Sequence, residues 1–193
     1  MRPLHSKRKR TSLQDAHLFI KNGVGGGTKD SDYISDYDRE NIVNEVTYDL
    51  INIVKRNFPK TTNLEYAILK THLIVEYALT QFIRCSVYVL VESESINFTF
   101  IQKLEIAILL GLGHGDPTFV PTLELINRLR NQVAHKFNFS IESVDDIIRI
   151  NLGEVTIQLN NKQRISYLKS ICVSICYRII GNIEARVSLT SGK

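Results

Sequence analysis

The chain has 193 residues, of which 44% are hydrophobic, so it can bury a substantial core and is expected to form one main domain. This length leaves no comfortable room for a second catalytic domain. The formal net charge is +4, but five Lys and Arg residues stand within the first ten positions and the rest of the chain is close to neutral.

The first 30 residues are predicted to form a flexible basic arm, followed by a single domain over residues 31–193. The arm contains the basic cluster and then Gly25-Gly26-Gly27, a composition that resists regular structure. Such an arm can bind nucleic acid by neutralising phosphates, or it can serve only as a solubilising tail. No apolar stretch follows its charges, as a secretory signal would require.

The three cysteines, Cys85, Cys172 and Cys176, cannot all pair with one another, and none belongs to a Cys-x-x-Cys motif. This usage is typical of a reducing compartment, so we expect a cytoplasmic protein. Cys172 and Cys176 lie four residues apart on an apolar helical face, which favours core packing over metal binding. No metal ion or other cofactor is predicted.

Hydrophobic residues recur at three- and four-residue spacing along most of the chain, a period typical of amphipathic helices. The predicted helices cover approximately residues 32–58, 63–92, 97–110, 117–137 and 162–185. Asn97 and Asp116 are the expected N-caps of the third and fourth helices. The sequence between the last two helices predicts a short helix over 142–150 and a brief extended segment over 155–159.

Short connections between these helices predict an all-α fold, an antiparallel up-and-down bundle of four to five helices. The longest apolar region, residues 64–91, is interrupted by four polar or charged residues, so it predicts a central buried helix and not a membrane span. These residues are Lys70, His72, Glu76 and Arg84. The apolar surface of this helix exceeds what one neighbour can cover, which favours a twofold dimer.

The segment Arg130-Asn131-Gln132-Val133-Ala134-His135 places a guanidinium, a carboxamide and an imidazole near the end of the fourth helix. Arg carries a permanent planar charge that suits phosphate oxygens, and His titrates near neutrality. On an ideal helix, residues five apart are separated by about 140° around the axis and about 7.5 Å along it, so Arg130 and His135 do not share a face. A site that spans a dimer axis would bring an Arg and a His from different subunits to one phosphate.

These side chains suit phosphodiester chemistry without a metal, which on RNA would be attack of a 2′-hydroxyl on the adjacent phosphorus. His135 would transfer the proton, Arg130 would neutralise the developing charge, and Asn131 would orient a phosphate oxygen or His135 itself. The products would carry a 2′,3′-cyclic phosphate and a 5′-hydroxyl. The alternative from spacing alone is that Arg130 and His135 only interact with the negative end of their helix.

Three neighbours on the motif helix are candidate substrate-binding residues. Asn127 lies four residues before Asn131 and shares its polar face. Arg128 and Lys136 flank the motif and would hold RNA phosphates, although the sequence favours a solvated surface charge at each position.

Glu76 belongs to a polar row on the otherwise apolar second helix. A buried carboxylate requires a partner, and Arg130 or Asn131 is the candidate if this helix packs against the motif helix. The row could equally meet Lys70, Arg84 or solvent. We therefore expect Glu76 to support the site and not to be catalytic.

The segment from Leu129 to His135 resembles the signature of the HEPN superfamily, which has an Arg, a polar residue, a few mostly apolar residues and a His near the end of a bundle helix. Residues 69–76 resemble the long second helix of HEPN groups related to the mannitol-operon repressor, and residues 100–104 resemble their next helix. The resemblance covers approximately residues 40–187. It implies a HEPN-like bundle, dimerisation through the motif region and, in many members, metal-independent ribonuclease activity in toxin–antitoxin or antiphage systems.

The resemblance also leaves a second class of function open, because some relatives regulate transcription or only bind nucleotides and RNA. In one toxin branch, a Tyr two residues after the His is modified by an antitoxin enzyme, but Phe137 stands at that place here. The predicted function is therefore an endoribonuclease that acts as a toxin or antiphage effector, and the alternative is a non-catalytic regulatory or binding protein. The expected partners are RNA, a second copy of the chain at the active site, and an antitoxin or regulatory protein, with no membrane.

Overall fold

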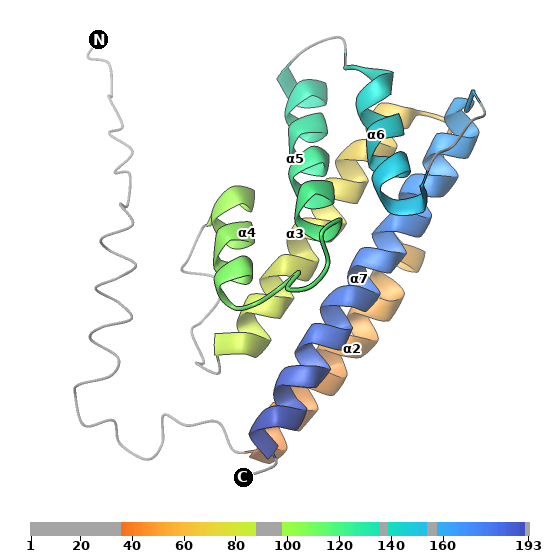
Figure 1. Ribbon diagram of the computed structural model, residues 1–193. Coiled ribbons are helices and arrows are strands. Elements are labelled where there is room, and N and C mark those ends of the chain that lie inside the picture. The colour runs from red at the N-terminus through yellow and green to blue at the C-terminus, as the bar shows by residue number, and fades with distance from the viewer. Residues whose placement is uncertain (1–35, 88–97, 136–138, 154–157, 192–193) are drawn as a thin grey trace, which may run out of the picture. The chain divides into compact units, whose positions relative to one another are not determined.

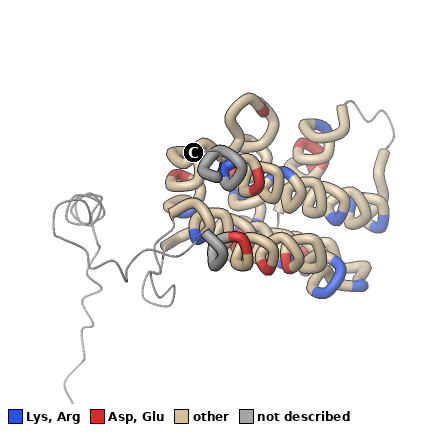
Figure 2. The backbone as a smooth tube through the Cα atoms, turned by 90° about the horizontal axis from the view of Figure 1, so that it is seen from below, with Lys and Arg blue, Asp and Glu red and all other residues tan. Residues whose placement is uncertain are grey.

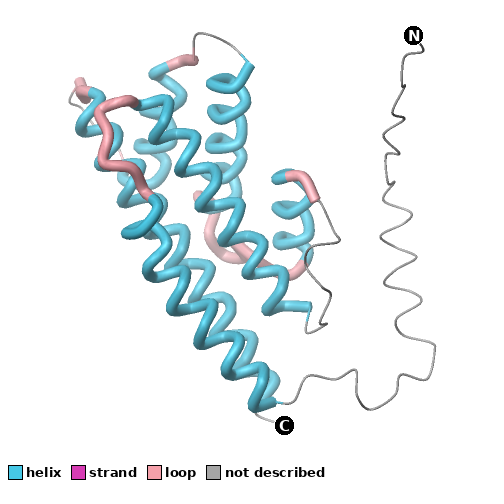
Figure 3. The backbone as a smooth tube through the Cα atoms, turned by 180° about the vertical axis from the view of Figure 1, so that it is seen from behind, coloured by secondary structure: helices cyan, strands magenta, loops and turns pink. Residues whose placement is uncertain are grey.

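The described part of the chain is helical throughout, which confirms the predicted all-α class. The computed structural model describes residues 36–87, 98–135, 139–153 and 158–191. Within these ranges the backbone forms helices joined by turns and loops, without a strand (Figure 3). The helices are α2 (Asp36–Asn57), α3 (Leu64–Val87), α4 (Phe100–Leu109), α5 (Phe119–His135), α6 (Ile141–Leu152) and α7 (Asn161–Ser191).

α3 lies at the centre of the helical arrangement, as predicted for the second helix. It packs against α2, α4, α5 and α7, whereas α6 packs against α5 and α7. α2 and α7 lie side by side and run in opposite directions (Figure 1). Basic and acidic positions are interspersed along the helices (Figure 2), so the placed charges are spread over several elements.

The core consists of aliphatic and aromatic side chains that repeat along one face of each helix. In α2, the buried Val43, Val46, Leu50 and Val54 follow three- and four-residue spacing. Phe82 of α3 and Phe119 of α5 are among the largest fully buried side chains. Many of these residues are β-branched or aromatic and favour a helix only weakly, so burial of the apolar stripe stabilises the helices more than local propensity does.

α4 is capped by Thr99, so the prediction of Asn97 as its N-cap is wrong, and Asn97 itself lies outside the described residues. The hydroxyl of Thr99 accepts a hydrogen bond from the backbone N–H of Gln102 at 3.4 Å. The Gln102 side chain in turn accepts from the backbone N–H of Thr99 at 2.9 Å. This reciprocal pair satisfies two N–H groups that the helix cannot satisfy itself, which Asn97 could not do from two residues further upstream.

Thr99→Ala is expected to lower the free energy of unfolding by about 1 kcal/mol, because the cap loses its hydroxyl acceptor. Urea unfolding followed by circular dichroism measures the change. Thr62→Ala is the matched control, since Thr62 is exposed and precedes α3 without lying in a helix. Equal stabilities for the two variants would contradict a stabilising role for the cap.

α5 begins at Phe119, two residues later than predicted, because Asp116 takes part in a turn before the helix. One Asp116 carboxylate oxygen accepts from the backbone N–H of Thr118 at 3.0 Å, and the other lies 3.0 Å from Nη1 of Arg178 on α7. The hydrogen bond from the Thr118 hydroxyl is the largest cause that lowers the pKa of Asp116. Pro121 is tolerated within the first turn, where its missing N–H has no intrahelical acceptor.

Apart from the end of α7, the remaining predicted boundaries agree with the structure to within a few residues where residues are described. The short helix predicted over 142–150 is α6, and α7 continues past the predicted end at residue 185. The predicted extended segment falls mostly on residues 154–157, which lie outside the described residues, as do the arm and residues 88–97. Three glycines with positive φ, Gly111, Gly113 and Gly115, form the turns that connect α4 with α5.

The predicted core packing of Cys172 and Cys176 is confirmed. Cys85, Cys172 and Cys176 are all free and buried. The hydrogen bond with the neighbouring Cys176, followed by burial, raises the pKa of Cys172, which keeps this thiol protonated. None of the described helices combines the length and apolar character that a membrane crossing requires.

Candidate functional site

α5 turns the predicted motif outward because its opposite side is anchored in the core. Leu123, Ile126 and Leu129 are buried at the spacing of one helical face. Asn131 and His135, four residues apart, are both exposed. The predicted polar face therefore exists as an accessible surface near the C-terminal end of α5.

The other predicted site residues on α5 have different surroundings. Asn127 and Arg130 are half-buried, and Arg128 is exposed. Lys136 lies outside the described residues. The polar face is thus solvent-accessible at its C-terminal end and partly enclosed one to two turns earlier.

The Arg130 side chain bonds to Asn131 but not to His135. Nη1 of Arg130 donates to Oδ1 of Asn131 at 3.2 Å. His135 forms no hydrogen bond or ion pair with Arg130 or with any other described residue. No bond among the described residues therefore joins the two side chains that would share one phosphate, which agrees with their different faces on an ideal helix.

His72 of α3 is buried against the inner end of the α5 polar face, where it contacts Asn127. Only 4% of its surface is exposed. Its Nε2 lies 3.2 Å from Oδ1 of Asn127, and its ring stacks on Phe100 of α4 with centroids 4.6 Å apart. The imidazole thus links three helices at one point, and sequence reasoning did not include it among the site residues.

Glu76 pairs with Lys103 of α4, and not with the predicted Arg130 or Asn131. Nζ of Lys103 lies 2.8 Å from Oε1 of Glu76, and both side chains are less than one-third exposed. Glu76 therefore joins α3 to α4, one turn from His72, and supports the packing behind the motif helix. The sequence carried no signal for this pair because the two residues stand 27 positions apart on different helices.

The alternative partners of Glu76 are also occupied elsewhere. Lys70 lies over the ring of Tyr66, 5.8 Å from its centroid, and Arg84 donates to Gln81 at 3.2 Å.

The predicted polar row on α3 consists of His72, Glu76 and Thr80. His72 contacts Asn127, Glu76 pairs with Lys103, and the Thr80 hydroxyl donates to the backbone oxygen of Glu76 at 2.9 Å.

Burial lowers the pKa of His72 below its ordinary value. Desolvation is the largest cause, and the positive charges of Arg130 and Lys103 act in the same direction, whereas Asn127 and Glu76 oppose it. Nδ1 is buried without a hydrogen-bond partner and lies 3.9 Å from Oε2 of Glu76. The neutral imidazole, with its proton on Nε2, donates to Asn127 and leaves only the Nδ1 lone pair unpaired.

The lowered pKa predicts a pH-dependent stability. The unfolded chain binds a proton at His72 near pH 6.5, above the folded pKa, so the stability is fully present above about pH 6.5 and declines as pH falls. One proton limits the slope to about 1.4 kcal/mol per pH unit. His72→Gln should reduce the slope measured by urea unfolding between pH 7 and 5, whereas His114→Gln at an exposed turn position should not. Equal slopes in wild type and His72→Gln would contradict a lowered pKa.

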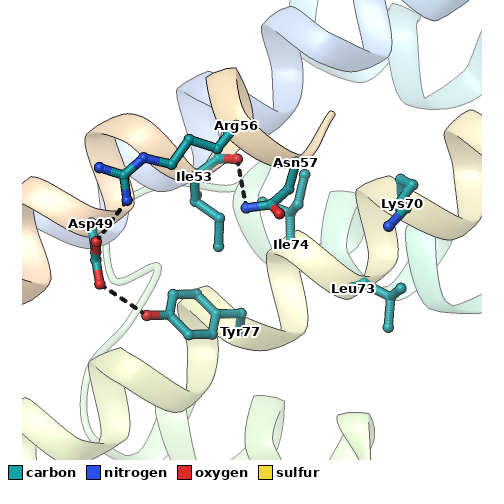
Figure 4. Close-up of a pocket in the computed structure, with 8 residues that line it drawn as sticks. All are labelled: Asp49, Ile53, Arg56, Asn57, Lys70, Leu73, Ile74 and Tyr77. Carbon is teal, nitrogen blue, oxygen red and sulfur yellow. Dashed lines mark hydrogen bonds and ion pairs between the residues drawn. The ribbon is translucent and has the colours of Figure 1, made fainter. Parts of the chain in front are cut away.

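A groove of about 380 Å³ lies between α2 and α3, away from the motif helix (Figure 4). Asp49 accepts from the Tyr77 hydroxyl at 3.4 Å and from Arg56 at 3.3 Å. Burial and the Asp49 carboxylate raise the pKa of Tyr77. None of the predicted site residues lines this groove.

Among the described residues, no three His, Cys, Asp or Glu side chains lie close enough together to hold a metal ion. Comparison of the chain with protein-family models, with curated proteins and with solved structures finds no significant match. The relationship to the HEPN superfamily therefore stays a prediction from the motif and its neighbouring segments.

Proposed function

We propose that the chain is a cytoplasmic, metal-independent endoribonuclease with a HEPN-like helical bundle, acting as a toxin or antiphage effector. The observation that carries this proposal is the motif from Arg130 to His135, which α5 presents at the accessible end of a polar face. An all-helical fold with a central α3 packed against α5 is consistent with the bundle that the resemblance implies.

The proposed reaction is attack of an RNA 2′-hydroxyl on the adjacent phosphorus, with loss of the 5′-oxygen. His135 takes the proton from the nucleophile or gives one to the leaving oxygen, and Arg130 neutralises the charge on the phosphorane. Asn131 donates to a non-bridging oxygen, since its own oxygen is already engaged by Arg130. Arg128 and Lys136 hold flanking phosphates.

The proposed active site forms where two copies of the chain meet. Arg130 and His135 form no bond with each other within one chain, and His135 has no described partner that would orient it, so a second subunit would complete the site. Exposed apolar side chains on α4 support an interface: Leu109 is 86% exposed, and Ile101 and Ile108 are also exposed. A twofold axis would place the same patch on both partners.

The alternative is a non-catalytic regulatory or binding protein, including an antitoxin-type partner. The separation of Arg130 from His135 within one chain favours this reading if the protein proves monomeric. The polar face would then hold a phosphate or a protein side chain without cleaving it.

Incubation of the purified chain with mixed RNA in EDTA distinguishes the two functions. The ribonuclease is expected to shorten the RNA and to leave 2′,3′-cyclic phosphate and 5′-hydroxyl ends, which end-specific ligation detects. RNA that is bound but stays intact would support the binding protein and reject the enzyme.

A further inference from the structure

The two Asn side chains of the α5 polar face are both held by their oxygen atoms. Oδ1 of Asn127 lies 3.2 Å from Nε2 of His72, and Oδ1 of Asn131 accepts from Nη1 of Arg130 at 3.2 Å. A carboxamide has one oxygen acceptor and one NH₂ group that donates two hydrogen bonds. Neither NH₂ group bonds to a described residue, so each remains available as a donor.

The direction of the Asn127 amide is set by His72. A neutral imidazole with its proton on Nε2 makes the bond to Asn127 and leaves only the Nδ1 lone pair unpaired. The other tautomer would bury an Nδ1–H with no acceptor in reach, because Oε2 of Glu76 is 3.9 Å away. An unsatisfied buried donor costs more than a lone pair, so the Nε2–H form prevails and Asn127 must present its oxygen to the ring.

His72 is well placed to impose this direction because it cannot easily move. Only 4% of its surface is exposed, and its ring stacks on Phe100 with an interplanar angle of 29°. Lys103 holds Oε1 of the neighbouring Glu76 carboxylate, and the other oxygen, Oε2, lies 3.9 Å from Nδ1, beyond hydrogen-bond distance. Three helices therefore converge on the orientation of one amide group.

The result is a row of donors beside a guanidinium. Asn127 and Asn131 are four residues apart, about 6 Å along the helix axis, and Arg130 lies between them in sequence. A surface that offers NH₂ groups and a cation, with its carbonyl oxygens already used, complements the acceptor-only oxygens of a phosphodiester.

We propose that Asn127 forms a second phosphate-binding subsite for the RNA backbone, adjacent to the reacting phosphate that Asn131 contacts, and that His72 is the positioning residue that orients Asn127. This inference rests on the proposed function for its substrate class. The subsite binds substrate and transition state alike, so its loss raises KM and leaves kcat largely unchanged.

The test compares KM and kcat for RNA cleavage among Asn127→Ala, His72→Leu and His72→Gln. Loss of one hydrogen bond predicts a three- to tenfold rise in KM for the first two variants, with kcat within about twofold of wild type. His72→Gln should restore KM, because its NH₂ group can still donate to Oδ1 of Asn127. The double variant His72→Leu, Asn127→Ala should be no weaker than Asn127→Ala alone.

Two further variants keep the outcome decisive if His72→Leu folds poorly. Asn127→Asp keeps the oxygen that faces His72 and replaces the NH₂ donor with an anionic oxygen, so its KM should exceed that of Asn127→Ala. Asn44→Ala at an exposed position of α2 is the matched control and should behave as wild type. A wild-type KM for Asn127→Ala or Asn127→Asp would overturn the subsite, and a wild-type KM for a folded His72→Leu would overturn the positioning role.

Failure of the proposed function is distinguishable from failure of the subsite. Equilibrium binding of the same RNA is measured in the His135→Ala background, which needs no cleavage. Weaker binding after Asn127→Ala, together with a wild-type protein that does not cut RNA, would reject the enzyme and keep the subsite. Cleavage by wild type, with binding that Asn127→Ala leaves unchanged, would keep the enzyme and reject the subsite.

Discussion

His135→Ala and Arg130→Ala are each expected to lower RNA cleavage by at least about a hundredfold. Removal of a general acid or base costs about 10² to 10⁴ in rate, and removal of a group that stabilises transition-state charge costs about 10² to 10³. Both residues lie outside the buried core, and their replacement removes few contacts, so helical content should stay intact. Single-turnover cleavage of RNA in EDTA measures the rate.

His114→Ala is the matched control, since it removes an exposed imidazole from the turn before α5. It should cut RNA at the wild-type rate. A folded His135→Ala or Arg130→Ala protein that also cuts at the wild-type rate would show that the assigned roles are wrong.

Mixing the same two inactive variants tests whether the site spans two subunits. In a mixed dimer, one of the two sites would receive Arg130 from one subunit and His135 from the other. Random exchange should therefore restore about one-quarter of wild-type activity, because half of the dimers are mixed and each has one intact site. A site contained within one chain would stay inactive after mixing.

Phe82→Ala is expected to lower the free energy of unfolding by about 3 to 5 kcal/mol, the range for truncation of a buried aromatic residue. Phe82 is fully buried in α3, and the guanidinium of Arg186 from α7 lies 5.5 Å from its ring centroid. The variant would lose both the burial of the ring and the contacts that join α3 to α7. Urea unfolding measures the change.

Leu73→Ala is the control for Phe82→Ala, because Leu73 lies on the same helix with 55% of its surface exposed. We expect less than about 1 kcal/mol of destabilisation there. Similar losses for the two variants would contradict the central position of α3 in the core.

The helices were predictable because hydrophobic spacing records which face of each helix is buried. α3 and α6 begin and end close to their predicted bounds where they are described. Which residue caps a helix depends on competing hydrogen bonds near the helix end, and hydrophobic spacing does not record these bonds. Thr99 has Gln102 at the right distance for a reciprocal pair, and Asp116 is engaged by Thr118 and Arg178 instead of starting the helix itself.

Only the part of the candidate site that lies within a single helix was predictable from the sequence. Spacing along α5 placed Asn127 and Asn131 on one polar face and separated Arg130 from His135. The bonds from His72 to Asn127 and from Lys103 to Glu76 join residues 55 and 27 positions apart. Such pairs depend on how the helices pack, and no periodicity within a single helix encodes them.

The most direct test of the central claim uses an RNA oligonucleotide that contains a cleavage site already mapped in mixed RNA. Wild-type protein in EDTA is incubated with this oligonucleotide and with a twin that lacks only the 2′-hydroxyl before the cut. We predict cleavage of the first to a 2′,3′-cyclic phosphate, no cleavage of the second, and no cleavage of either by His135→Ala. Equal cleavage of the two oligonucleotides, or cleavage that survives His135→Ala, would contradict the account.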